Sequence, residues 1–281
     1  MNPSIQPGSI VVAADGSKHA DRALLWAAAQ AQAEHRPVVV VSADEGDVHA
    51  INAEAVRRVA EAAPDAEVVG LTAPGDPRGV LVELSTDASM IVLGSRGRGT
   101  VRSMLLGSVS AAVSRLALCP VVVCRPPAED GPGAGVLIGV DGTPESGPVL
   151  ELGFAHAALH GRPVTVVHCV WDVMAAVAGL RNVRVEDLDL GEGDEAHRLL
   201  AASVAGFREK YPDVPVTLRV THGLVDEVLG GRSAAWDLVV VGRHPLDSVG
   251  RLAVGSIATA VVERARTTVA VVPVPRDQPP G

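Results

Sequence analysis

The chain has 281 residues, of which 47% are hydrophobic but only 2% aromatic, so we expect large cores built from aliphatic side chains. Its formal net charge of −9 argues against a general nucleic-acid binder, because such proteins present a basic face. No apolar run approaches the ~20 residues that a membrane-spanning helix requires, so we expect no spanning segment and no membrane partner.

Short apolar runs alternate with helix-like patterns along the first half of the chain. We expect strands near Ile10–Ala13, Val38–Val41, Glu67–Leu71, Met90–Leu93 and Val121–Cys124, and helices near Lys18–His35, Val48–Ala63, Arg78–Leu84 and Ser108–Leu116. This alternation predicts a parallel sheet covered by helices on both faces. Ligands of such sheets bind beyond the carboxyl ends of the strands, so Asp15 and Gly94, which follow the first and fourth strands, are expected to share one ligand.

The second half of the chain repeats the first. Gly8–Ser17 reads GSIVVAADGS, and Gly135–Pro144 reads GVLIGVDGTP. Each segment is an apolar strand that ends in Asp-Gly-Ser or Asp-Gly-Thr and leads into a helical pattern. We expect Ser17 and Thr143 to be N-caps, with Pro144 at the first helical position.

The spacing of the repeated motifs defines two domains. The Asp-Gly pairs lie 126 residues apart (141 − 15) and the later Gly-Ser pairs 148 apart (255 − 107), so the second copy carries 22 extra residues between them. We place the excess after Val170. The charged, proline-rich segment from Pro126 marks a linker. We therefore predict two duplicated α/β units, each a five-stranded parallel open sandwich of Rossmann-like type: a first domain at 1–127, a linker at 128–134 and a second domain at 135–281.

A glycine-rich stretch follows the fourth expected strand. Residues Gly94 to Ser108 read GSRGRGTVRSMLLGS, which is the pattern G-x-x-G-x9-G-S, and a helical pattern follows. Glycines between a strand and a helix let the backbone approach an anion or adopt φ > 0, and backbone N–H groups at a helix N-terminus bind phosphate. A tight connection without a ligand is the alternative. Arg96, Arg98 and Arg102 favour an anion, although solvation explains each arginine equally well.

These motifs resemble the universal stress protein family in its tandem-domain form, over nearly the whole chain. The resemblance rests on the complete glycine motif, on Asp-Gly-Ser after the first strand, on Gly75-Asp76-Pro77 and on the final strand of the Cys-Pro-Val-Val-Val type. It implies an ATP-binding fold of five parallel strands, similar to adenine-nucleotide alpha hydrolases. It also implies that the last strands of the two domains pair with each other within one molecule.

The resemblance also assigns site residues. The triphosphate would contact Gly94, Gly97, Gly107, Ser108 and the adjoining Val109. Asp15 would lie near the nucleoside and Ser42, through its backbone, near adenine. The implied cofactor is ATP, with or without Mg²⁺. In the second copy the corresponding residues are Asp141, Gly242, Gly255 and Ser256.

The second copy departs from the pattern at one position. Pro245 stands where the second glycine should be. Proline has no N–H to donate and fixes φ near −65°, so one backbone donor is lost and the loop bends differently. We therefore predict that the second copy binds nucleotide more weakly than the first copy, or not at all.

Other motifs carry less information. No glycine loop ends in the Gly-Lys-Ser/Thr of a Walker A motif. His156 and His160 stand four residues apart, but nothing completes a metal site, so we expect them on a helix surface and predict no metal. The three cysteines form no disulfide framework, and the first eight residues do not resemble a signal peptide. Both observations lead us to expect a cytoplasmic protein.

Three functions remain open on the sequence. The first, implied by the resemblance, is an ATP-binding regulator of stress adaptation or growth arrest, and we expect a regulator rather than an enzyme because no catalytic base or transition-state arginine is identifiable. The second is a slow ATPase or a nucleotide-dependent enzyme. The third is a structural interaction module without nucleotide. The sequence does not identify a protein partner, and it leaves open whether two such chains form a homodimer.

Overall fold

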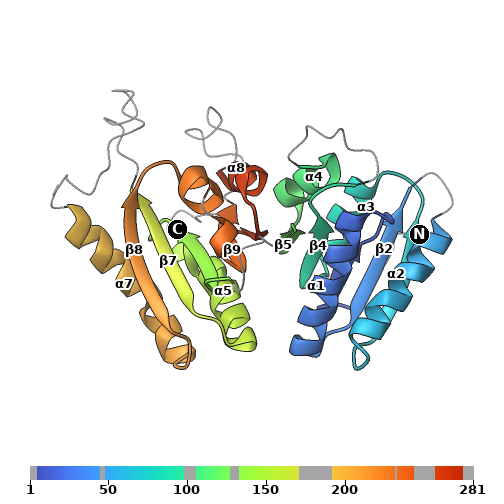
Figure 1. Cartoon of the computed structure of the whole chain (residues 1–281), viewed down its shortest axis with the longest axis horizontal. Coiled ribbons are helices and arrows are strands. Elements are labelled where there is room, and N and C mark those ends of the chain that lie inside the picture. The colour runs from blue at the N-terminus through green and yellow to red at the C-terminus, as the bar shows by residue number, and fades with distance from the viewer. Residues whose placement is uncertain are drawn as a thin grey trace, which may run out of the picture.

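The computed structural model describes residues 5–44, 48–97, 106–126, 133–170, 192–231, 233–243 and 257–274. Two halves of similar architecture stand side by side, and one sheet runs through both of them (Figure 1). Each half carries helices on both faces of its part of the sheet, as the alternation of strands and helices predicts.

The first half matches the expected elements to within two residues at each end. Its strands are β1 (Ile10–Ala13), β2 (Val38–Ala43), β3 (Val68–Ala73), β4 (Met90–Gly94) and β5 (Val121–Cys124). Its helices are α1 (Lys18–Glu34), α2 (His49–Ala62), α3 (Pro77–Leu84) and α4 (Ser108–Leu116). Valine-rich runs form most of these strands: β1, β2, β4 and β5 are buried on both faces, which suits β-branched side chains, while the edge strand β3 is partly exposed.

The second half repeats this order with one substitution. Its strands are β6 (Val136–Val140), β7 (Val164–Val170), β8 (Val216–His222), β9 (Leu238–Arg243) and β10 (Thr268–Pro273), and its α-helices are α5 (Gly147–His160), α7 (Glu192–Lys210) and α8 (Ile257–Arg264). Where the first half has α3, the second has a π-helical turn, Glu227–Gly231, and a 3₁₀ turn, Ser233–Ala235. The extra residues that we placed after Val170 lie outside the described residues.

The ten strands form one sheet in the order β3-β2-β1-β4-β5-β10-β9-β6-β7-β8. Within each half every pair of neighbouring strands is parallel. At the centre, β5 and β10 pair antiparallel, with Val123 opposite Val269 and Val121 opposite Val271. The last strands of the two domains therefore pair within one molecule, which confirms the expectation drawn from the family resemblance.

Each face of the sheet has its own apolar core. On one face the strands pack against α1, α2, α5 and α7, and on the other against α3, α4 and α8. The two cores run through both halves because the central strand pair is continuous. At about 25 cal/mol per Å² of buried apolar surface, such cores are the main stabilising contribution to the fold. The side chains that fill these cores are almost all aliphatic, as the composition of the chain suggests.

The repeated Asp-Gly-Ser/Thr motifs form similar loops with different caps. Gly16 and Gly142 both have positive φ, at 78° and 80°, which explains glycine at this position of each copy. The Ser17 hydroxyl accepts a hydrogen bond from the Ala20 N–H at 3.2 Å, so this predicted N-cap is confirmed. Thr143 does occupy the N-cap position, with Pro144 next to it as predicted, but at the start of a 3₁₀ turn, and its hydroxyl donates to Asp141 Oδ1 at 2.7 Å instead of accepting from the turn. The helix α5 begins only after a 3₁₀ turn, Pro144–Ser146.

The two histidines that we expected on a helix surface lie instead between the domains. The Gln30 side chain of α1, only 4% exposed, meets His156 and His160 of α5 across the seam. Its Oε1 lies 3.1 Å from His156 Nδ1 and 3.1 Å from His160 Nε2. The i, i+4 spacing places both rings on one side of α5, which is why a single acceptor can reach both. Burial against the other domain was not visible in the spacing alone.

The Gln30 amide has a defined orientation in this cluster. Its Nε2 donates to Glu34 Oε1 at 2.7 Å, so Oε1 must face the histidines and accept from them. Trp26 stacks on His156, with ring centroids 5.9 Å apart and an interplanar angle of 7°. Burial, and then the nearby His160 and Arg162, lower the pKa of His156 to about 3 from a usual value of 6.5. Neutral rings at the seam are therefore part of the folded state.

The cluster of Gln30, His156 and His160 predicts that the folded protein loses stability in acid. Below pH ~6.5 the unfolded chain binds a proton at His156, while the folded chain does not until the pH nears about 3. The contribution of neutral His156 to stability is therefore complete above pH ~6.5 and declines as the pH falls toward about 3. Between pH 7 and 5 we expect the free energy of unfolding to fall by about 2 kcal/mol more in the wild type than in His156→Phe, which keeps a ring on Trp26. Urea unfolding at both pH values measures the difference.

The exposed His197 of α7 provides the control. His197→Phe should keep the pH dependence of the wild type. If His156→Phe also kept it, the neutral state of His156 would not contribute to stability.

Candidate functional site

The β1–α1 loop brings Asp15 to the carboxyl end of the sheet. Its Oδ1 accepts a hydrogen bond from the Ser17 backbone N–H at 2.9 Å, which closes a short turn around Gly16. Its Oδ2 faces the loop after β4, since a Cβ built on Gly97 would lie only 2.7 Å from that oxygen. Asp15 and the glycine loop therefore meet at one edge, as expected from the parallel sheet.

The glycines of the loop allow close approach rather than positive φ. Gly94, Gly97 and Gly107 all lack the positive φ for which sequence reasoning allowed. A Cβ on Gly94 would lie 2.6 Å from the backbone carbonyl carbon and oxygen of His19, so β4 runs directly against the first turn of α1. Glycine is needed here because two backbones touch.

The Gly107-Ser108 pair at the end of the glycine motif lies at the start of α4. The Gly107 N–H donates to the Ser95 carbonyl at 2.9 Å, and the Ser110 hydroxyl donates to the Gly94 carbonyl at 2.7 Å. These bonds hold the α4 N-terminus beside the loop after β4. Gly107 is the N-cap and has no side chain that could accept from the first N–H groups of the helix. The N-terminus of α4, with Ser108 exposed and Val109 partly buried behind it, therefore faces the loop with donors and a positive dipole end.

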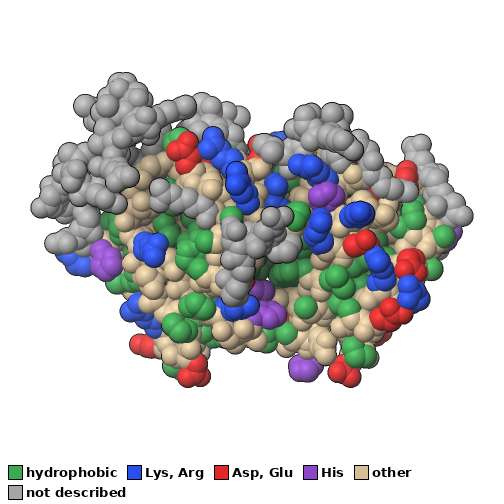
Figure 2. Space-filling view, viewed as in Figure 1, with side chains coloured by type: hydrophobic (Ala, Val, Ile, Leu, Met, Phe, Trp, Pro, Cys, Tyr) green, Lys and Arg blue, Asp and Glu red, His purple; other side chains and the backbone are tan. Residues whose placement is uncertain are grey.

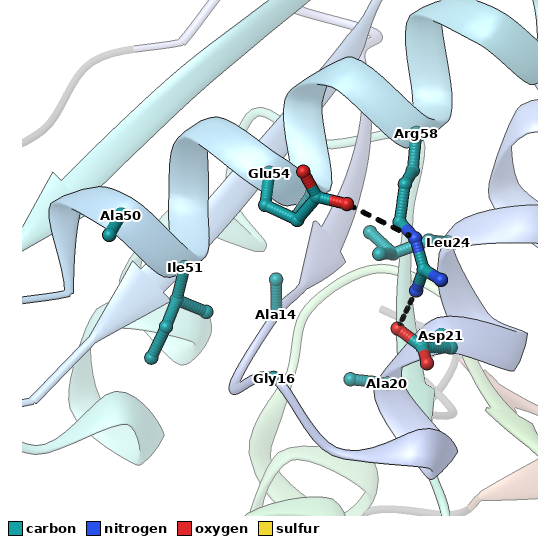
Figure 3. A pocket seen from close by; sticks show the side chains of 10 residues that line it. Ala14, Gly16, Ala20, Asp21, Leu24, Ala50, Ile51, Glu54 and Arg58 are labelled. Carbon is teal, nitrogen blue, oxygen red and sulfur yellow. Dashed lines mark hydrogen bonds and ion pairs between the residues drawn. The ribbon is translucent and has the colours of Figure 1, made fainter.

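A cavity opens on the other side of Asp15, between α1 and α2. Its volume is about 300 Å³, which lies at the lower end of the range for small-molecule sites. Its floor and walls are mostly apolar, formed by Ala14, Gly16, Ala20, Leu24, Ala50, Ile51 and Ala55. Figure 3 shows Arg58 reaching across the rim from α2 to Asp21 of α1, with Glu54 beside it.

The structure places Ser42 inside the protein. The residue is only 1% exposed, and its hydroxyl donates to the Ala14 carbonyl at 2.8 Å. Asn52 of α2 approaches from the other side, with its Nδ2 at 3.3 Å from the Ser42 hydroxyl oxygen. The Ser42 side chain therefore ties β2 to the β1–α1 loop and to α2, and only its backbone stays a candidate for contact with a base.

Basic groups gather around the loop after β4. His19 Nδ1 is 3.3 Å from the Ser95 hydroxyl oxygen and 3.5 Å from Arg22 Nη1. Burial, then Arg22 and Arg96, lower the pKa of His19, while Asp15 opposes them. Figure 2 shows Lys and Arg side chains gathered with a histidine on the surface between α1 and α4. The local charge thus favours an anion although the whole chain is acidic.

Sequence reasoning missed His19, Ser95 and the cavity-lining residues of α2. His19 gave no signal because it lies outside every motif. Ser95 occupies a variable position of the glycine pattern. The α2 residues were hidden because an amphipathic helix that lines a cavity has the same apolar spacing as one that only packs.

The second copy is only partly described. Asp141 follows β6, and its Oδ1 accepts from the Thr143 N–H at 3.0 Å and from the Thr143 and Ser146 hydroxyls at 2.7 Å each. Gly242 lies near the end of β9, where a Cβ would lie 3.0 Å from a Val274 methyl group. Pro245, Gly255 and Ser256 lie outside the described residues, as do Arg98 and Arg102 of the first loop.

Within the described residues, no group of three or more His, Cys, Asp or Glu side chains is arranged to hold a metal ion. Among the described helices, none combines the length and apolarity that crossing a membrane requires.

Comparison with known proteins identifies the family. The model of the universal stress protein family matches residues 42–125 and again residues 135–273. The chain belongs to the universal stress protein family. The first matched segment runs from the end of β2 through β5, and the second covers β6 to β10, so the architecture is the tandem form.

Individual relatives agree over nearly the whole chain. A universal stress protein of Mycobacterium tuberculosis (strain ATCC 25618 / H37Rv) is 33% identical over 289 aligned positions, covering 93% of this chain and 96% of the relative. A second universal stress protein of the same strain is 30% identical over 306 positions. The crystal structure of a universal stress protein from Archaeoglobus fulgidus DSM 4304 matches with a TM-score of 0.68 at 19% identity, covering 96% of this chain and 99% of that one, which supports the fold.

The contact between β4 and α1 predicts a cost for any side chain at Gly94. In Gly94→Ala the new Cβ meets backbone atoms of His19 that cannot move away, so we expect a loss of about 1–3 kcal/mol in the free energy of unfolding. Gly79→Ala is the control, because a Cβ there meets nothing within 4 Å inside α3. Equal stability of the two variants in urea unfolding would show that the β4–α1 approach is not tight.

Proposed function

We propose that this universal stress protein is an ATP-binding regulator of stress adaptation or growth arrest, with its nucleotide at the first glycine loop. The observation that supports this function best is the meeting of Asp15, the Gly94–Gly97 backbone and the α4 N-terminus at one edge of the sheet. The loop backbone and the α4 N-terminus offer N–H donors to an anion, and Asp15 offers an acceptor to hydroxyl groups beside it, a combination that suits a nucleotide.

The arrangement suggests how the nucleotide lies. The phosphates would rest on the backbone of Gly94 to Gly97 and on the N-terminus of α4, with help from the Ser108 hydroxyl. Asp15 would accept from the ribose hydroxyls. The base would enter the apolar cavity between α1 and α2, which begins at Ala14 and Gly16 on the other side of Asp15. A mostly apolar cavity with polar groups at one end suits an adenine nucleotide.

The second domain would bind nucleotide weakly or not at all. Pro245 removes a backbone donor from its loop. Moreover, Asp141 Oδ1 accepts three hydrogen bonds from its own loop, from the Thr143 N–H and from the Thr143 and Ser146 hydroxyls, whereas Asp15 directs its Oδ2 toward the first glycine loop. Both features support a chain with one functional nucleotide site.

A regulatory role agrees better with these residues than a dedicated enzyme. The part of the chain that the structure describes places one carboxylate, Asp15, and one histidine, His19, against the loop. His19 is held by Ser95 and Arg22, and its lowered pKa makes it a weak base. A slow ATPase is the second candidate, because Asp15 could orient a water molecule at the phosphate chain.

Gly107→Ala tests the site directly. The new Cβ would lie 3.4 Å from Arg96 Cα and 3.7 Å from the Gly97 nitrogen, which is tolerable for folding but fills the space that a phosphate would use. We expect the affinity for ATP, measured by isothermal titration calorimetry, to fall at least tenfold, or about 1.4 kcal/mol. The melting temperature of the free protein should change little.

The control is Gly79→Ala, which lies in α3 and should leave ATP affinity unchanged. Unchanged ATP affinity in folded Gly107→Ala would show that the phosphates do not bind at the α4 N-terminus. Steady-state phosphate release by the wild type, at a rate that Asp15→Ala abolishes, would favour the ATPase instead.

A further inference from the structure

Arg125 connects the first glycine loop to the second domain. It is the residue after β5, and the Ser95 N–H of the loop donates to the carbonyl of the preceding Cys124 at 3.1 Å. Arg125 therefore stands one strand away from the loop that would hold the phosphates. The antiparallel pairing of β5 with β10 places this end of β5 beside the start of β10 and the end of α8.

The guanidinium of Arg125 crosses the seam. Its Nη2 donates to the Val262 carbonyl at 2.5 Å and to the Glu263 carbonyl at 3.3 Å, both in the last turn of α8. A cation at a helix C-terminus also interacts favourably with the helix dipole. The other end of α8, Ile257, directly follows Gly255 and Ser256 of the second glycine motif. One arginine thus touches the helix that begins at the second motif.

The surroundings of Arg125 carry an excess of positive charge. Arg96 of the glycine loop is close enough to lower the pKa of Arg125, after the larger effect of burial, and Glu263 opposes it. Arg22, Arg96 and Arg125 all lower the pKa of His19, against Asp15. The charges that act on Arg125 and His19 are thus three guanidinium groups and two carboxylates, Asp15 and Glu263. A polyanion bound near the arginines would relieve their mutual repulsion.

We infer that Arg125 binds the phosphate chain of the nucleotide at the first glycine loop and transmits its presence to α8 of the second domain. The inference rests on the proposed ATP site and adds the residue that couples it to the other half of the chain. A guanidinium can hold a helix carbonyl and a phosphate oxygen at once, because its five donors lie on a planar fork. The inference favours a nucleoside di- or triphosphate over a monophosphate, because its longer phosphate chain offers more negative charge to the arginines.

Arg243 provides a matched control. It ends β9 in the second domain, and its Nη2 donates across the seam to the Ala117 carbonyl, the C-cap of α4. Within the described residues, burial is the only cause that lowers the pKa of Arg243, whereas Arg96 also lowers the pKa of Arg125. Arg243→Gln and Arg125→Gln both remove an arginine that binds a helix end across the seam, through one carbonyl for Arg243 and two for Arg125. Only Arg125→Gln removes charge from the phosphate region.

The experiment compares ATP and AMP on the wild type and both variants. In calorimetry we expect Arg125→Gln to reduce the preference for ATP over AMP at least tenfold, whereas Arg243→Gln changes it less than twofold. In hydrogen–deuterium exchange, ATP should slow exchange of the α8 backbone in the wild type and in Arg243→Gln, but not in Arg125→Gln. AMP should have no such effect on α8 in any of the three proteins.

The outcomes separate this inference from the function on which it rests. A wild type that binds ATP while Arg125→Gln keeps both the ATP preference and the slowed exchange of α8 overturns the inference and leaves the nucleotide site in place. A wild type that binds neither nucleotide overturns both. Equal losses of preference in the two variants would assign the effect to the seam as a whole and overturn the role of Arg125.

Discussion

The antiparallel pairing of β5 with β10 is the constraint on which the rest of this structure depends. Each half alone would end in an exposed edge strand of almost pure valine, which is an aggregation hazard. Pairing the two edges removes both hazards and makes the chain its own dimer. The same pairing brings α1 against α5 on one face and α4 beside α8 on the other (Figure 1).

Two kinds of polar contact across the seam follow from this pairing. On one face, Gln30 accepts from two neutral histidines. On the other face, an arginine of each domain binds the end of a helix in the other domain. Hydrogen bonds of this kind specify one relative placement of the domains, because a buried polar group that loses its partner costs about 1–3 kcal/mol. The arginines of the helix-end contacts lie next to the glycine motifs: Arg243 directly follows Gly242, and Arg125 follows Cys124, whose carbonyl accepts from the Ser95 N–H. The coupling proposed above rests on this proximity.

The sequence predicted the fold better than it predicted the site. Strands such as β5 and helices such as α4 were located to the residue, because apolar runs bounded by glycine and proline have few alternatives. Contacts between segments that are distant in the sequence were harder to predict. The spacing of His156 and His160 predicted a shared side of α5 but not that Gln30 would cover it. Likewise the glycine pattern indicated a phosphate-binding loop. Glycine is needed at position 94, however, because the backbone of His19 lies against it, and no local pattern shows that contact.

The central claim is that one chain with two similar domains carries one functional nucleotide site. Native mass spectrometry of the purified protein with saturating ATP counts the bound nucleotides per chain directly. The account predicts one ATP per chain in the wild type, and a much lower occupancy in Gly107→Ala at an ATP concentration near the wild-type dissociation constant. Two ATP per chain in the wild type, or equal occupancy of the wild type and Gly107→Ala at that concentration, would contradict it.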